Sequence, residues 1–303
     1  MLHKTSSIII DIIRLVSMRR RSLYFALTAG IIGITPAFAS HSNQNFNEPS
    51  PSYEVMLDSC DYYLNRMKWD DAERSIRTCL RMQPASPINT LLFYNLGMAQ
   101  FNNYKPDKAE ESFSLAIVRD ELNPKYLLAR SRARIHLIKL SEAEEDVDAV
   151  LAVDSLNTEA LYTKALISRL LNHPEKAEPY LNKLLDLDTS DVNARISLSE
   201  ILIGKGDFKA AYDMLKDYYS NDSEVDADLR FNRMLSLLYM ENDEMLTDEI
   251  RAGIAAYPRE GRFYMIRAAL ERRRFQNQDA EVDKKRALEF GVSPEAISRF
   301  LAF

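Results

Sequence analysis

Histidines and cysteines, the residues most often used for catalysis and metal binding, are few in this sequence and far apart. After residue 39 the histidines are His41, His136 and His173, and no cluster of His and Cys has the spacing of a zinc site. The H-E-x-x-H arrangement of zinc enzymes does not occur either. We therefore expect no metal, no cofactor and no enzymatic activity.

Two other stretches contain residues that could do chemistry, and both have a simpler interpretation. Gly204-Lys205-Gly206 lacks the remaining residues of a phosphate-binding loop and is typical of a turn between helices. Glu142-Ala143-Glu144-Glu145-Asp146 is rich in carboxylates, but an acidic run on a helix favours a face in contact with solvent. We expect neither stretch to be a functional site.

Composition and charge restrict the fold class and the partners. The sequence has only 8 Gly and 11 Pro in 303 residues, and its many Ala, Leu, Glu, Arg and Lys residues favour helices, because their side chains lose little rotamer freedom there. The net charge is −6; the first 39 residues hold five basic residues and one acidic residue, or +4, so the remainder carries −10. Since such a body repels a phosphate backbone, we expect an all-α protein with no nucleic-acid partner.

The amino-terminal segment has the three parts of a secretory signal peptide. Arg19-Arg20-Arg21 precedes an apolar run from Ser22 to Pro36, and Ala37-Phe38-Ala39 supplies the small residues of a cleavage site. The run contains Gly and Pro and is short for a membrane span of about 20 residues. We expect residues 1–39 to be removed as a signal peptide, with Met18 a better start than Met1; the alternative is a membrane anchor.

The chain beyond the predicted cleavage point begins with a polar stretch. Residues 40–52 are rich in Asn, Ser and Pro and are expected to form a flexible linker. The mature protein would then lie in the periplasm of a bacterium or be secreted, without stable membrane insertion.

A period of 34 residues runs through the middle of the chain. The alanines at this spacing are Ala109, Ala143, Ala177 and Ala211. A small residue stands twelve positions before each of them, namely Gly97, Ser131, Ala165 and Ser199. Because two antiparallel helices approach closely only where the facing side chains are small, we expect these residues to pack against one another in successive helix pairs.

This pattern resembles the tetratricopeptide repeat, which has a period of 34 with Leu-Gly in its first helix and Ala-x₃-Phe in its second. Leu96-Gly97 and Ala109 with Phe113 match it closely. The resemblance covers residues 53–292 and implies an all-α, right-handed superhelix, or solenoid, of about seven helix pairs. Residues 293–303 open with Ser293-Pro294 and are expected to form a carboxy-terminal capping helix.

The resemblance also places the two cysteines of the chain. Cys60 falls at the small position of its first helix, and Cys79 falls near the far end of the second. Counting outward from the turn near Lys68 gives an axial offset of about five residues, or roughly 7 Å at 1.5 Å per residue. Bridged cysteines usually have Cα atoms within about 6.8 Å of each other. Two buried thiols are therefore favoured over a disulfide.

In this family the first helix of each pair faces a concave groove that holds a peptide. Mapped onto this sequence, the groove residues are Tyr94, Met98, Asn102, Lys125, Arg132, His136, Tyr162 and Arg169. Aromatic side chains beside cations suit an extended peptide that carries acidic groups. The alternative is that the tyrosines only pack between repeats.

Two functions are compatible with these features. The first is an exported scaffold that binds a protein or peptide partner in the groove, for assembly of a cell-envelope complex. The second is an accessory or sugar-binding protein of envelope polysaccharide metabolism, in which the groove binds a small ligand.

Export gives a direct prediction about the mature chain. Mass spectrometry of the protein from its native cell is expected to show an amino terminus at Ser40, because a signal peptidase accepts the small side chains of Ala37 and Ala39. An amino terminus at Met1 or Met18 would instead make residues 22–39 an anchor.

Overall fold

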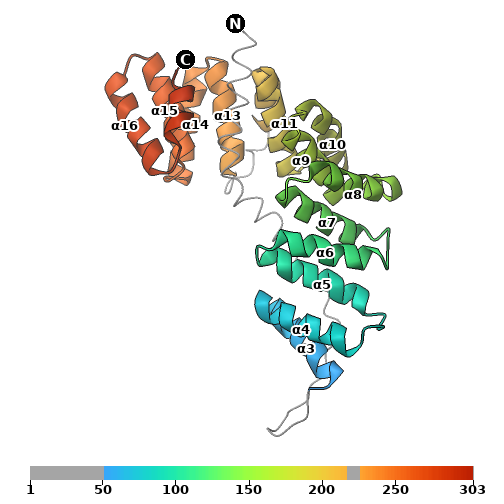
Figure 1. The fold of residues 1–303 in the computed structure, drawn as a ribbon. Helices are drawn as coiled ribbons and strands as arrows, with labels where there is room; N and C mark the ends of the chain where they lie inside the picture. Colours follow the sequence, from blue (N-terminus) through green and yellow to red (C-terminus); the bar gives the residue numbers. More distant parts are fainter. Residues whose placement is uncertain (1–50, 217–225, 303) are drawn as a thin grey trace. The chain divides into compact units, whose positions relative to one another are not determined.

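A computed structural model describes residues 51–216 and 226–302 of the chain, and these residues hold fifteen α-helices and no strand (Figure 1). The predicted signal peptide and almost all of the predicted linker lie outside the described residues. None of the described helices is both long enough and apolar enough to cross a bilayer.

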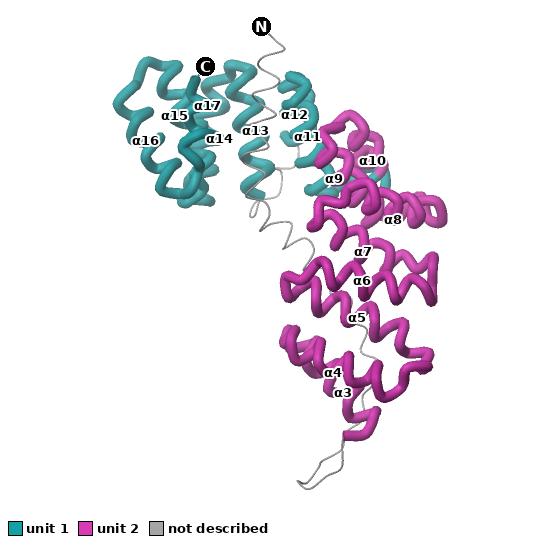
Figure 2. Tube along the Cα trace, viewed as in Figure 1, with its two compact units in different colours: residues 1–31, 184–303 teal, residues 32–183 magenta. Residues whose placement is uncertain are grey.

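The chain divides into two compact units, with the boundary between Lys183 and Leu184 (Figure 2). We call the described residues 51–183 the N-terminal unit and residues 184–302 the C-terminal unit. The helices that begin in the N-terminal unit are α3 (Tyr53–Asn65), α4 (Trp69–Met82), α5 (Asn89–Asn102), α6 (Pro106–Ile117), α7 (Pro124–His136), α8 (Leu140–Val153), α9 (Thr158–Leu170) and α10 (Pro174–Leu187). Those of the C-terminal unit are α11 (Val192–Lys205), α12 (Phe208–Lys216), α13 (Ala227–Tyr239), α14 (Asp243–Ala256), α15 (Gly261–Arg273), α16 (Asn277–Glu289) and α17 (Pro294–Phe300).

Within each unit the helices form pairs that follow one another in chain order. In the N-terminal unit α3 packs on α4, α5 on α6 and α7 on α8, and the first helices also meet, α5 with α7 and α7 with α9. In the C-terminal unit α11 packs on α12, α13 on α14 and α15 on α16, and α17 contacts both α15 and α16. The expected all-α fold of consecutive helix pairs followed by a terminal helix is therefore confirmed.

Small residues allow the two helices of a pair to approach closely. The residues predicted to pack there are all buried: Gly97, Ala109, Ala143, Ala165, Ala177 and Ala211. A Cβ atom added to Gly97 would lie 2.5 Å from a ring carbon of Phe113, closer than carbon atoms can approach. The Ser131 hydroxyl, also buried, donates a hydrogen bond of 3.0 Å to the carbonyl oxygen of Ala143, so the small polar residue is satisfied inside the pair.

Side-chain caps fix where the first helices begin. Asn123, Asn157 and Asp191 precede α7, α9 and α11, and each accepts a hydrogen bond from a backbone N–H in the first turn. Ser52 does the same for α3. Such caps satisfy N–H groups that have no partner inside the helix and stabilise it by about 1 kcal/mol each.

The turn inside each pair contains a residue in the left-handed region of backbone conformation. Gly206 adopts it without steric cost, as expected for the predicted turn. The other turns place side chains there: Met67, Tyr104, Ile138, Asn172, Glu241 and Phe275. Ile138, with φ of 61°, is branched at Cβ and 76% exposed, so it combines backbone strain with almost no burial.

Relief of this strain gives a stability prediction. Ile138→Gly is expected to raise the free energy of unfolding by about 0.5 to 1 kcal/mol, because the left-handed conformation costs a branched residue more than glycine gains in unfolded-chain entropy. Glu145→Gly, at an exposed position inside α8, serves as the matched control and is expected to lower it by about 1 kcal/mol. Urea unfolding measures the free energy of unfolding of each variant. A lower value for Ile138→Gly than for the wild type would contradict backbone strain at this residue.

Candidate functional site

Helix α7 presents two faces with different roles, and its three alternating arginines show the division. Arg130 and Arg134, four residues apart, reach Asp146 on α8. Arg132 and His136, also four apart, lie on the opposite side of the helix, since positions i and i+4 share a face. Arg132 contacts Glu159 of the next first helix, α9, at 3.4 Å.

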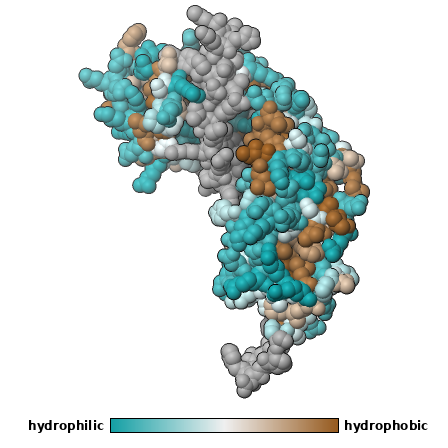
Figure 3. Space-filling view, viewed as in Figure 1, coloured by the Kyte–Doolittle hydropathy of each residue, from teal (hydrophilic) through white to brown (hydrophobic). Residues whose placement is uncertain are grey.

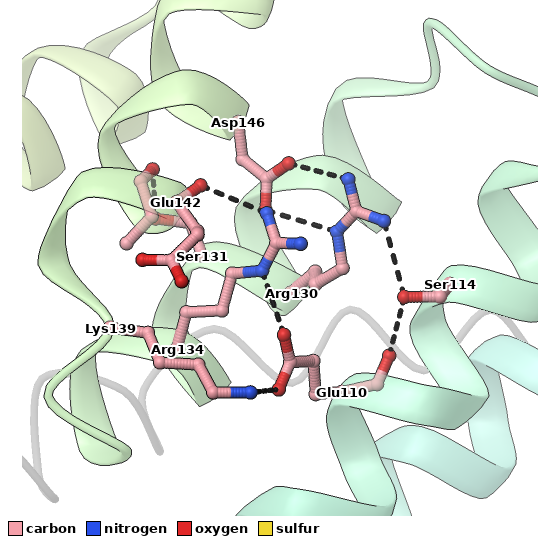
Figure 4. Close-up of polar contacts among 9 residues, drawn as sticks. Glu110, Ser114, Arg130, Ser131, Arg134, Lys139, Glu142 and Asp146 are labelled. Carbon is pink, nitrogen blue, oxygen red and sulfur yellow. Dashed lines mark hydrogen bonds and ion pairs between the residues drawn. The ribbon is translucent and has the colours of Figure 1, made fainter.

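The first face of α7 carries a polar cluster between successive helix pairs (Figure 4). The Asp146 carboxylate accepts hydrogen bonds from Arg130 Nη2 at 2.6 Å and from Arg134 Nη1 at 2.8 Å. Arg134 Nε donates to Glu110 on α6 at 3.0 Å, and Lys139 Nζ donates to the other oxygen of Glu110 at 2.7 Å. The cluster thus links α6 of one pair to α7 and α8 of the next.

Asp146 corrects one sequence-based expectation. The acidic run from Glu142 to Asp146 was expected to face solvent, and Glu142 and Glu145 do so, but Asp146 is only 3% exposed. A buried carboxylate requires counter-charges, and here Arg130 and Arg134 supply them. The burial of Asp146 was indicated in the sequence only by Arg130 and Arg134, sixteen and twelve positions earlier. These arginines become informative once it is known that α7 faces α8.

Glu110 is held in its charged form by the same cluster. Burial raises the pKa of its carboxyl, but hydrogen bonds from Lys139 and Arg134 outweigh that effect and hold the pKa below its usual value. The preceding pair repeats the arrangement, since Glu73 on α4 accepts hydrogen bonds from Gln100 on α5 at 3.2 Å and from Lys105 at 3.1 Å. These acidic residues therefore join consecutive helix pairs and are not available to a ligand.

The predicted groove residues lie on the second face of α7 and on the neighbouring first helices α5 and α9. On α5 two of them, Tyr94 and Met98, take part in packing. The ring of Tyr94 lies 5.2 Å from that of Tyr126 and 5.9 Å from that of Phe113, between centroids. Burial raises the pKa of Tyr94, against the opposing effect of Arg132, so the phenol stays neutral. Met98 packs with Phe101 against a buried cluster that includes Phe113.

Asn102 completes the set on α5. It is half-buried, and its Nδ2 donates to the carbonyl oxygen of Met98 at 2.8 Å, which leaves its amide oxygen for other contacts. Tyr94 thus has the packing role that the sequence left open, and Met98 packs in the neighbouring cluster.

On α7 and α9 the predicted residues are more accessible. Lys125 and His136 are exposed, Tyr162 and Arg169 are half-buried, and Arg132 is 18% exposed. The ring of His136 meets that of Phe101 edge-on, at 4.9 Å between centroids, so the accessible surface continues from α5 to α7. Glu159, Tyr162 and Arg169 follow at spacings of three and seven, which puts them on one face of α9.

We call the surface formed by these positions of α5, α7 and α9 the first-helix face. Its accessible residues are Asn102, Lys125, Arg132, His136, Glu159, Tyr162 and Arg169. Sequence reasoning missed Glu159, which neutralises part of the charge of Arg132; its place at the start of α9, opposite a basic residue of α7, was the available signal. The face offers aromatic rings, cations and amides, a combination suited to binding a peptide.

The two cysteines are buried, as expected, and their sulfur atoms are in contact. Both are free thiols, with 2% and 0% of Cys60 and Cys79 exposed. Their Sγ atoms are 3.6 Å apart. The axial offset expected from residue counting ignored the direction of the side chains, which bring the sulfur atoms into contact across α3 and α4.

The C-terminal unit contains a second polar cluster, with a perturbed carboxyl group. Arg267 on α15 forms an ion pair with the buried Asp283 of α16, and Glu271 lies 3.9 Å from the Arg267 guanidinium. Burial, followed by the negative charge of Asp283, raises the pKa of Glu271 to about 7. The charge of Arg267, which is paired with Asp283, lowers the pKa and offsets only part of that rise.

Comparison with known proteins agrees with this geometry. The sequence profile of the tetratricopeptide repeat matches residues 158–191. A tetratricopeptide-repeat protein of Parabacteroides merdae has a similar structure, with a TM-score of 0.65 and 22% identity over 82% of this chain and 97% of that one. The structure of pilF from Pseudomonas aeruginosa is similar at a TM-score of 0.58 and 16% identity, over 71% of this chain and 96% of that one.

A curated human relative, RNA polymerase II-associated protein 3, is 30% identical over 125 residues, which is 41% of this chain. The match spans only 18% of that protein's length. Residues 158–191 thus match a tetratricopeptide repeat, and the fold of the chain is similar to that of tetratricopeptide-repeat proteins.

Removal of the central carboxylate tests the polar cluster. Asp146→Ala is expected to lower the free energy of unfolding by about 3 kcal/mol, because it leaves Arg130 and part of Arg134 buried without a counter-charge. Glu145→Ala, its exposed neighbour, is expected to change it by less than about 0.5 kcal/mol. Urea unfolding distinguishes the two, and equal effects would show that the cluster does not stabilise the fold.

Glu271 gives a prediction about pH. Its pKa in the folded chain, about 7, lies above the ordinary value near 4.5, so the folded state binds the proton more tightly. That stabilisation is complete below pH 4.5 and is lost as the pH rises through 7. Glu271→Gln resembles the protonated form at every pH. Its free energy of unfolding is expected to match that of the wild type at pH 4 and to exceed it by up to about 3 kcal/mol at pH 8. A difference that does not change with pH would contradict this.

Proposed function

We propose that the chain is a scaffold that binds an extended peptide segment of a partner protein on its first-helix face. The observation that carries the proposal is the division of α7. Arg130 and Arg134 are occupied by Asp146 in the polar cluster, whereas Lys125 and His136 are exposed on the opposite side of the helix, with His136 against the ring of Phe101. One face of α7 is therefore packed against neighbouring helices, and the other presents exposed side chains to a ligand.

The chemistry of the first-helix face favours a peptide with acidic and apolar side chains. Lys125 can pair with a carboxylate of the peptide. The half-buried rings of Phe101 and Tyr162 can contact its apolar side chains. Arg132 already pairs with Glu159, so an acidic group of the peptide would compete with that carboxylate. Figure 3 shows brown, apolar areas within an otherwise hydrophilic surface on the side turned to the viewer.

The place of action in this proposal is the bacterial cell envelope. It is supported by the sequence of residues 19–39, with three arginines, an apolar run and Ala37-Phe38-Ala39. In that compartment the scaffold would hold a component of an envelope complex during assembly.

Peptide selection tests the proposal without knowledge of the partner. Residues 40–303 are used to select binders from a phage-displayed library of random peptides, and the affinities of selected peptides are measured by fluorescence anisotropy. Lys125→Ala combined with His136→Ala is expected to weaken binding at least tenfold, or about 1.4 kcal/mol. Higher salt is expected to weaken it further, since exposed charges are screened.

A matched pair of substitutions on the second helices provides the control. Lys108→Ala combined with Glu145→Ala removes exposed charges from α6 and α8 and is expected to leave the affinity unchanged. Failure to select any peptide, or equal loss in the two double variants, would contradict binding on the first-helix face.

A further inference from the structure

The first helix pair differs from the others at the two positions where its helices touch. At the position of Cys60 the next four pairs carry Gly97, Ser131, Ala165 and Ser199, and at that of Cys79 the next two carry Ala116 and Val150. None of these residues can form a covalent bond across its pair. Cys60 and Cys79 are the only cysteines of the chain, and they lie on facing positions of α3 and α4.

The geometry brings the two sulfur atoms together. Their separation of 3.6 Å is van der Waals contact, and a disulfide requires about 2.05 Å, which is within reach of small side-chain rotations. The two thiols share a hydrogen bond in which either sulfur can be the donor, and the pair has a lowered pKa at Cys79 and a raised pKa at Cys60, chiefly through this contact. Cys79 is thus the better nucleophile of the pair.

The position of α3 in the array makes a covalent link useful. Helix α3 packs chiefly on α4, and no other helix precedes it among the described residues. At the opposite end α17 contacts α15 and α16. Helices at the end of a repeat array lack one neighbour and open more easily than internal ones, and among the described residues α3 holds that position in the N-terminal unit.

We propose that Cys60 and Cys79 form a disulfide that locks α3 onto α4 and closes the amino-terminal end of the array. The oxidant is a disulfide-bearing molecule, either a small one such as oxidised glutathione or a thiol–disulfide exchange protein. In the cell the reaction rests on the proposed export, because disulfides persist in oxidising compartments. In solution it depends only on the two side chains.

The reaction takes place in two exchange steps. The Cys79 thiolate attacks one sulfur of the oxidant, forms a mixed disulfide and releases the first thiolate. The Cys60 thiolate then attacks the Cys79 sulfur, forms the internal bond and releases the second thiolate. Two protein thiols are oxidised, one oxidant disulfide is reduced to two thiols, and the two protons pass to these products. Opening of α3 admits the oxidant, since both thiols are buried in the closed pair.

The test uses purified residues 40–303 equilibrated with oxidised glutathione, then quenched with acid and an alkylating reagent. Mass spectrometry is expected to find the chain 2 Da lighter than its reduced form, without alkylation or bound glutathione, and with Cys60 and Cys79 in one cross-linked peptide. Hydrogen–deuterium exchange of the α3 amides is expected to slow at least tenfold on oxidation. Two alkylated thiols, stable glutathione adducts or a dimer linked between chains would each overturn the proposal.

Cys60→Ser combined with Cys79→Ala is the control, because other pairs carry Ser and Ala at these positions. In this double variant, hydrogen–deuterium exchange of the α3 amides is expected to be equally fast with and without oxidant. If oxidant slowed that exchange as much as in the wild type, the slowing would not come from the Cys60–Cys79 bond, and the proposal would be refuted.

Alkylation of the chain in its native cell, followed by the same mass measurement, tests the disulfide and the proposed export independently. A chain that begins at Ser40 with two free thiols would overturn the disulfide and leave export intact. A chain that keeps its leader and has reduced thiols in the cell, yet forms the bond in solution, would overturn export alone.

Discussion

The close approach of the two helices within each pair is the constraint on which the rest of the structure depends. At Gly97 the distance is so short that a single added carbon would meet the ring of Phe113. Because the small residue must face the second helix, the positions on the opposite side of the first helix point away from the pair. The spacing that permits packing therefore also decides which side chains remain for a ligand.

Polar contacts between consecutive pairs add a second constraint. Glu73 is held by Gln100 and Lys105, and Glu110 is held by Arg134 and Lys139. Each acid lies at the start of one second helix and its partners belong to the next pair, so the contacts fix the register of neighbouring pairs. Apolar packing alone allows sliding more readily than paired charges with directional hydrogen bonds. Fixed register brings the accessible residues of α5, α7 and α9 onto one face.

The fold could be predicted from the sequence because the small residues repeat without a gap, and burial follows from that period. The roles of individual charged residues could not be predicted from this period. Arg130, Arg132 and Arg134 look alike in sequence, and only the positions of Asp146 and Glu159 show that the first and third pair with α8 and the second with α9. Glu159 was missed because its contact joins two consecutive helix pairs. The turns at Tyr104 and Ile138 were missed because they lack the glycine that usually marks a left-handed residue.

The central claim is that the polar cluster occupies one face of α7 and that a peptide binds on the first-helix face of α5, α7 and α9. Hydrogen–deuterium exchange of residues 40–303, with and without a saturating selected peptide, tests it most directly. Slower exchange is expected in α5, α7 and α9, with α6 and α8 unchanged. Protection confined to α6 and α8, or to the C-terminal unit, would place the ligand elsewhere and contradict the account.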